Sequence, residues 1–211
     1  MRKRAFVRTL VLLLLTMFGI GILAGAYIIT TGVSARTQPG RLEAFTARTV
    51  RGIAIRTRVR SLTNPVPASD AVIAEGMEHF ADHCAVCHGN DGSGETEMGR
   101  GLYPRAPDMR LPATQNLSDA ELFYIIENGV RLTGMPGWST GTKEGETSSW
   151  HLVHFIRRLP KLTEDEITRM EDLNPRTPAE LHEREEEKKF LQGGDADAAP
   201  ATPTHEHAHN P

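Results

Sequence analysis

Residues 83–94 read HCAVCHGNDGSG and contain both cysteines of the chain, Cys84 and Cys87. His88 follows the second cysteine directly, and glycines and small polar residues come next. Two cysteines cannot build the disulfide framework on which small secreted domains rely. The stretch therefore has to be interpreted through the chemistry of two thiols and one imidazole at fixed spacing.

Residues 70–88 are expected to form one helix whose apolar residues recur at helical spacing. That face comprises Val72, Ile73, Met77, Phe80, Ala81 and Cys84. Positions i, i+3 and i+4 lie on one side of a helix, so Cys84, Cys87 and His88 would surround a single flat object. The C-x-x-C-H pattern is the attachment signature of a c-type haem, with two thioether sulfurs and a histidine bound to iron.

Two other chemistries use closely spaced cysteines. A thioredoxin-like dithiol needs a βαβ setting, which the surrounding sequence does not offer. A structural zinc site would pair C-x-x-C with a second close pair of ligands, and no cysteine follows Cys87. Zinc is harder to dismiss than a dithiol because histidines flank the motif on both sides, at His79, His83, His151 and His154.

A compact all-α domain is expected over residues 69–160. Residues 89–115 are rich in glycine and proline and predict loops. Ser118 and Glu121 form a capping box that starts a second helix, which Gly129 ends. Glycine and proline interrupt residues 129–149, and a third helix is expected from Ser148 until Pro160 stops it.

The first 30 residues predict a membrane segment. The run from Thr9 to Ile29 is uncharged and about 21 residues long, which as a helix spans about 31 Å. An uncleaved anchor is the favoured interpretation, and a signal peptide cleaved near Ala24-Gly25-Ala26 is the alternative. The basic N-terminus places the following domain on the exported, periplasmic side of a bacterial inner membrane.

The segments around the domain differ in charge. Residues 1–60 carry eleven Lys and Arg against the single acid Glu43. Residues 31–68 are interpreted as a basic linker, weakly strand-like at 53–59. Its arginines suit anionic lipid headgroups, and a solvated linker or a strap lying on the domain is an equal alternative. A helical extension is expected over residues 161–192, with a capping box at Thr163 and Glu166, a second start at Thr177 and a stop at Gly193-Gly194. Residues 193–211 predict a disordered tail, and its His205, His207 and His209 leave weak metal binding open.

CAVCHGNDGSG resembles the haem-attachment sequence of the class I cytochromes c, and the resemblance covers roughly residues 69–160. It implies helices wrapped around one covalently bound haem c, and a crossing of the first and last helices near Gly76, Phe80 and Phe155. It also implies an axial methionine opposite His88. Met135, in TGMPGW, matches that motif. Met77 shares the attachment helix, and Met98 and Met109 fall in the loop after the attachment site, which is expected to wrap the side of the haem on which His88 lies.

The resemblance further implies that a backbone carbonyl of the proline-containing loop orients His88, with Pro107 preferred over Pro104. Trp138, Tyr103 and Arg131 are candidates to line the haem or meet its propionates. With iron held on both sides, the chain is expected to transfer single electrons rather than act as an enzyme.

The expected function is that of a membrane-tethered cytochrome c that passes electrons between redox protein partners. A fixed haem subunit of a respiratory or dehydrogenase complex is the main alternative, and a haem sensor or peroxidase is a further one. The nearly balanced charge, a formal net of -3, argues against nucleic-acid binding. Residues 69–160 carry 13 Asp and Glu against 7 Lys and Arg, which suits a partner with a basic patch.

Overall fold

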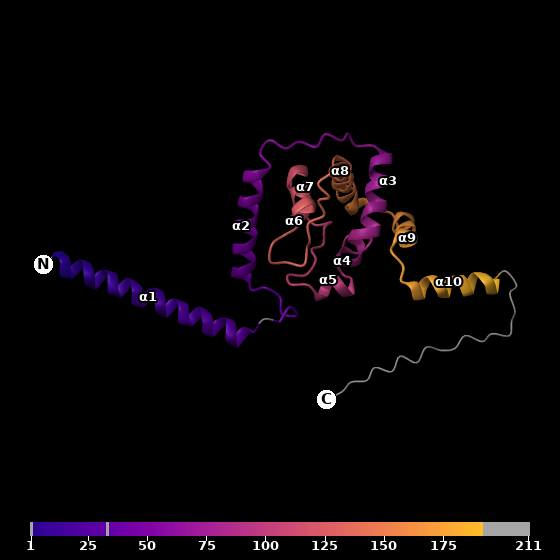
Figure 1. Cartoon of the computed structure of the whole chain (residues 1–211). Helices are drawn as coiled ribbons and strands as arrows, with labels where there is room; N and C mark the ends of the chain where they lie inside the picture. The colour runs from indigo at the N-terminus through magenta and orange to yellow at the C-terminus, as the bar shows by residue number, and fades with distance from the viewer. Residues whose placement is uncertain (1, 33, 192–211) are drawn as a thin grey trace, which may run out of the picture.

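The computed structural model describes residues 2–32 and 34–191 and, over these residues, contains helices and no strands. Figure 1 shows a central helical domain, with α1 extending from one side and α10 lying on the other. The all-α prediction is confirmed. The helices are α1 (Arg2–Thr31), α2 (Arg41–Arg58), α3 (Asp70–His79), α4 (Ala85–His88), α5 (Glu97–Gly101), α6 (Pro112–Gln115), α7 (Asp119–Asn128), α8 (Lys143–Arg158), α9 (Glu164–Leu173) and α10 (Pro178–Leu191).

The expected helix over residues 70–88 is continuous but not uniform. α3 passes into a π-helical turn, η1 (Phe80–Cys84), and then into α4. Ser69 caps the start, because its hydroxyl accepts a hydrogen bond from the Val72 N–H. A π-turn inserts one extra residue per turn and is frequent at functional sites. Here it ends at the first cysteine of the motif.

The crossing of α3 and α8 organises the domain. At Gly76 the two helices approach so closely that a Cβ would lie 2.3 Å from the carbonyl oxygen of His151. One turn further on, the rings of Phe80 and Phe155 lie 5.1 Å apart between centroids. The crossing expected at Gly76, Phe80 and Phe155 is therefore confirmed.

The main core gathers around this crossing. Phe123 on α7 stacks on Trp150 on α8 with ring centroids 4.0 Å apart. The buried apolar members of the cluster are Met77, Phe80, Ala81, Ala85, Met109, Leu122, Ile126, Trp150, Leu152, Val153, Phe155, Ile156, Leu159 and Met170. Cys84 and Trp138 pack against the same cluster.

The capping predictions succeed where the signals are local. Ser118 and Glu121 form a reciprocal capping box at α7, and Gly129 ends that helix with φ of 66°. The start of α8 was placed too late, because the helix begins at Lys143 and not at Ser148. Thr142 caps it by accepting a hydrogen bond from the Gly145 N–H. A glycine in the first turn is tolerated there, since the cap compensates for its poor helix propensity.

The strand-like interpretation of residues 53–59 is wrong, because this segment lies in the 18-residue helix α2. Ile55 and Val59, four residues apart, are buried against Ala120, Tyr124 and Ile125 of α7. Arg56 also bonds Glu121 at 3.1 Å between Nε and Oε1. Tertiary packing of the i, i+4 pair therefore overrides the short alternating pattern.

The C-terminal extension forms two helices, as expected. Thr163 and Glu166 make the predicted capping box at α9, and Met170 of that helix is fully buried. Arg158 at the end of α8 bonds Glu166 at 3.1 Å, which holds α9 against the domain. α10 is exposed along its length. The expected stop at Gly193-Gly194, and the tail with His205, His207 and His209, lie outside the described residues.

α1 has the length and composition of a membrane span. Lys3–Thr30 has a mean hydropathy of 2.3 and none of its apolar window is buried against the rest of the chain. Of the helices described, it alone is long and apolar enough to cross a bilayer. A signal sequence near the N-terminus can also form an apolar helix of this kind, so length and composition do not distinguish it from an anchor.

Candidate functional site

Cys84, Cys87 and His88 lie on consecutive helical turns, as the spacing predicts. Cys84 is the last residue of the π-turn, and Cys87 and His88 belong to α4. Both cysteines are free and half-buried, and His88 is only 9% exposed. The two sulfurs and the imidazole are thereby brought together at the edge of the main core.

The residues after the motif satisfy the carbonyls that α4 leaves without partners. Thr96 Oγ1 donates to the carbonyl of Val86 at 2.8 Å and lies 3.1 Å from that of Cys87. The Gly94 N–H donates to the His88 carbonyl at 2.7 Å. Gly94 has φ of 75°, and a Cβ there would lie 2.5 Å from the carbonyl oxygen of Ala106. These contacts explain why small residues and glycine follow the second cysteine.

The His88 ring has one nitrogen sealed inside the protein. Nδ1 is the one buried side-chain nitrogen or oxygen without a hydrogen-bond partner among residues 2–32 and 34–191. Burial lowers the pKa of His88, and the nearby backbone of Pro107 acts in the opposite direction without completing a hydrogen bond of normal geometry. Of the two prolines considered, Pro107 is the one whose backbone lies near the His88 ring, which agrees with the preference for Pro107 over Pro104. A neutral imidazole with Nδ1 buried in this way would leave Nε2 as the nitrogen that can bind a metal.

The environment of the cysteines favours neutral sulfur. Burial, reinforced by the neighbouring Cys87, raises the pKa of Cys84 to about 12. Burial also raises the pKa of Cys87. A reactive thiol needs thiolate, which this environment disfavours. A thioether carries no charge, so these sulfur positions fit covalent attachment of a haem.

Met135 lies in a segment that folds back on the end of α7. Its N–H donates to Thr133 Oγ1 at 3.1 Å, and its carbonyl accepts from the Val130 N–H at 3.1 Å. Gly129, with φ of 66°, permits this turn, because a Cβ there would lie 2.6 Å from the Met135 carbonyl oxygen. The half-buried Met135 side chain is thus carried on a backbone fixed on both sides.

One ring contact connects the methionine segment to the cysteine motif. The indole of Trp138 meets the imidazole of His83 edge to face, with centroids 5.3 Å apart. Trp138 follows Met135 by three residues, and His83 immediately precedes Cys84. The backbone N–H of Trp138 donates to the Ile126 carbonyl at 2.9 Å, and this bond anchors the segment to α7. The fold therefore brings the two predicted parts of the site to one region.

The remaining methionines have other surroundings. Met77, Met109 and Met170 are buried in the main core, and Met98 is 54% exposed. Of the candidates to line a haem, Trp138 contacts the motif region, through its ring contact with His83. The Tyr103 hydroxyl is engaged by Glu43 of α2, and Arg131 is exposed.

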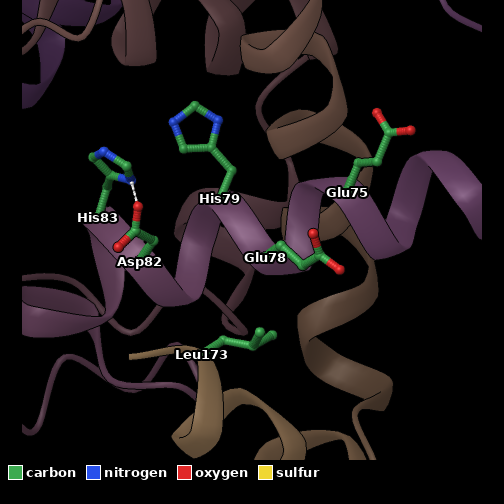
Figure 2. A pocket seen from close by; sticks show the side chains of 6 residues that line it. All are labelled: Glu75, Glu78, His79, Asp82, His83 and Leu173. Carbon is green, nitrogen blue, oxygen red and sulfur yellow. Dashed lines mark ion pairs between the residues drawn. The ribbon is translucent and has the colours of Figure 1, made fainter. Parts of the chain in front are cut away.

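The histidines around the motif do not form a zinc site. Figure 2 shows a surface pocket lined by Glu75, Glu78, His79, Asp82, His83 and Leu173, in which His83 pairs with Asp82. His151 Nδ1 pairs with Glu75 at 2.8 Å, and His154 bonds the Val66 carbonyl. Within the described part of the chain, no three His, Cys, Asp or Glu side chains are arranged to hold a metal ion.

Some features of the site carry no recognisable signal in the sequence. Two features were not anticipated: the π-turn that presents Cys84, and the pair of hydrogen-bond contacts from the Thr96 hydroxyl to the end of α4. A threonine eight residues after the motif has no pattern of its own, and only the folded loop brings it to the end of α4.

Residues 71–156 match the family model described as cytochrome C oxidase, cbb3-type, subunit III. The matched segment contains the C-x-x-C-H motif, Met135 and most of α8. This segment is therefore similar to a c-type cytochrome domain, and its helices are those expected of a class I cytochrome c.

Curated relatives agree with this match. The chain is similar to the cbb3-type cytochrome c oxidase subunit FixP of Rhizobium etli, at 33% identity over 105 residues, which is 48% of this chain and 32% of that protein. It is also similar to subunit FixP of Azorhizobium caulinodans, at 30% identity over 110 residues, or 48% and 32% of the two chains. Subunit CcoP of Cereibacter sphaeroides is 33% identical over 87 residues, or 37% and 25%. The aligned part is thus about a third or less of each relative.

Proposed function

We propose that this chain is a membrane-anchored haem c subunit of a respiratory oxidoreductase complex. The observation that carries the proposal is the position of Cys84, Cys87 and His88 on one helical segment inside residues 71–156, which match the cbb3-type subunit III family. The chain would accept and pass on single electrons. It would not itself bind the substrate of the complex.

In this proposal Cys84 and Cys87 would hold the haem through thioether bonds to its vinyl groups. His88, through Nε2, and Met135 would be the two protein ligands of its iron. The sealed Nδ1 beside Pro107, the neutral environment of the sulfurs and the fixed backbone of Met135 support these assignments. Such a haem c supplies reversible one-electron transfer between ferric and ferrous iron.

The residues of the chain would restrict that chemistry to electron transfer. His88 and Met135 together leave no open coordination position for a substrate. A thioether sulfur of methionine is a weak donor to ferric iron, so His/Met ligation favours a higher reduction potential than two histidines. The half-buried cysteines hold the group at the edge of the core, from which a partner can exchange electrons.

The comparisons favour a subunit of a complex over a free carrier. The relatives are named as subunits of cbb3-type cytochrome c oxidases. A separate membrane-tethered carrier that shuttles between complexes is the second candidate, and the anchor α1 fits both. The basic N-terminus supports a single span with the haem domain on the periplasmic side.

Purification of the intact chain distinguishes the two. An affinity-tagged chain, extracted from membranes in mild detergent, is expected to elute with a catalytic subunit in constant stoichiometry. The variant Met135→Ala should elute with the same subunit while electron transfer falls, which separates assembly from redox function. Elution of the haem-bearing chain alone would favour the free carrier. Ready binding of carbon monoxide by the ferrous wild-type protein would instead favour a sensor or peroxidase.

A further inference from the structure

α2 has two apolar faces of different kinds. Its inner face, at Ile55 and Val59, is buried against α7. Glu43 at its other end accepts a hydrogen bond from the hydroxyl of Tyr103, in the loop after α5. The helix is therefore fastened to the cytochrome domain near both ends and has a defined orientation on it.

The outer face of α2 is largely apolar, and none of the described parts of the chain covers its apolar side chains. Leu42, Phe45, Val50 and Ile53 are 78%, 69%, 61% and 59% exposed. At 100° per residue these four span about 140° of the helix circumference. Leu42, Val50 and Ile53 point about 100° or more away from Ile55 and Val59, and Phe45 lies at the edge nearer to Val59. Exposed apolar residues grouped in this way on one helix mark an interaction surface.

The position of α2 next to the membrane span identifies what this face meets. Residues 32–40 connect α1 to α2 and reach at most about 30 Å even if fully extended. In Figure 1, α1 leaves the domain on the side on which α2 lies, and α2 runs across the direction of α1 in this view. A helix lying across the direction of a membrane span lies along the bilayer surface.

The charges of the segment suit phospholipid headgroups. α2 carries five arginines, at positions 41, 48, 51, 56 and 58, against the single acid Glu43. Arg56 is paired with Glu121, and the other four arginines lie outside the apolar stripe, with Arg41 and Arg48 nearest to its edge at Phe45. Long arginine side chains can extend from the sides of an interfacial helix to lipid phosphates while their stems stay in apolar surroundings.

We propose that α2 is an interfacial helix that inserts Leu42, Phe45, Val50 and Ile53 into the phospholipid surface next to the α1 span. The opposite face holds α7, so the helix fixes the orientation of the cytochrome domain on the membrane. This inference requires α1 to remain in the membrane, but it does not depend on the identity of the redox partner. It gives the basic linker a structural task that a flexible tether would lack.

Photo-crosslinking in the intact membrane tests the occupant of the face. A photoreactive phenylalanine analogue would be placed at Phe45 or Ile53 of the full chain, and at Ala47 as a matched control. Ala47 is exposed on the same helix, but outside the apolar stripe. After irradiation, mass spectrometry of the chain detects phospholipid adducts, and a denaturing gel detects adducts with other polypeptides.

The expected result is a lipid adduct at positions 45 and 53 in several-fold higher yield than at 47. A crosslink from positions 45 and 53 to another polypeptide would overturn the proposal, because the face would then be a protein interface. Equal lipid yields at all three positions would overturn it as well. The crosslinking measurement does not require haem. The interfacial-helix proposal can therefore fail while the proposed redox function holds, and the redox function can fail while the interfacial helix holds.

Discussion

A Cβ on Gly76 would lie 2.3 Å from the carbonyl oxygen of His151, so α3 and α8 meet backbone to backbone at this position. The obstacle is main chain and cannot rotate away as a side chain could. Phe80 and Phe155 pack beside this contact and are almost fully buried. The helix that bears the cysteine motif is positioned by this crossing.

Substitution of Gly76 by alanine should therefore destabilise the domain. Overpacking of a close contact typically costs about 1–3 kcal/mol, and here the two helices must separate. The free energy of unfolding of the haem-loaded protein in denaturant measures the effect. Gly52 on α2 is the matched control, because a Cβ there meets nothing within 4 Å. Its alanine variant should be neutral or gain up to about 1 kcal/mol, and an equal loss for both variants would contradict the crossing argument.

The sequence predicted those parts of the fold that depend on local signals. Ser118 with Glu121, and Thr163 with Glu166, mark helix starts at the residues where the structure has them. Such caps act within one turn, so they can be recognised without knowledge of the tertiary structure. The small residue and the two aromatic residues of the α3–α8 crossing were also placed correctly, through the family resemblance.

The errors fall where packing decides between two patterns. Ile53, Ile55 and Val59 suggested alternation, but Ile55 and Val59 are also an i, i+4 pair, and contact with α7 selects the helix. At α8 the glycine at position 145 concealed a start that Thr142 caps. In the site, the spacing of the cysteines predicted their common helical segment, whereas the contact of Thr96 with α4 depends on how the loop folds back.

Substitution of Met135 by alanine should remove the sulfur-to-iron band at low energy in the oxidised spectrum. The reduction potential should fall and the ferrous protein should bind carbon monoxide, because the second axial ligand has been lost. Visible absorption and a redox titration measure these changes. Met98, which is 54% exposed, provides the control, and its alanine variant should keep the band. Persistence of the band in the Met135 variant would place the ligand elsewhere.

Glu166 should make the docking of α9 depend on pH. The Thr163 N–H, together with the Thr163 hydroxyl and Arg158, lowers the pKa of this carboxyl below its ordinary 4.5 despite partial burial. A lowered folded-state pKa stabilises the protein above the ordinary value, and that contribution is lost as the pH falls through the folded-state pKa. Wild type should therefore be more stable than Glu166→Gln at pH 6 to 7, by on the order of 1 kcal/mol.

The difference between the two proteins should close as the solution is acidified below pH 4.5. Denaturant unfolding at a series of pH values measures it. Glu164, exposed on the same helix, is the control. The unfolding free energy of Glu164→Gln should differ less from that of wild type than the unfolding free energy of Glu166→Gln does. If the difference in unfolding free energy between wild type and Glu166→Gln did not change with pH, the carboxylate charge would not stabilise α9.

Covalent attachment of haem through two cysteines is the central claim, and haem staining after denaturing electrophoresis tests it most directly. The chain should be expressed with a working haem-attachment apparatus, as wild type and as Cys84→Ser/Cys87→Ser, and separated into membrane and soluble fractions. The account predicts a haem-stained band near 23.3 kDa in the wild-type membrane fraction and none in the double variant. A wild-type chain that is present in the membrane but carries no stain would contradict it.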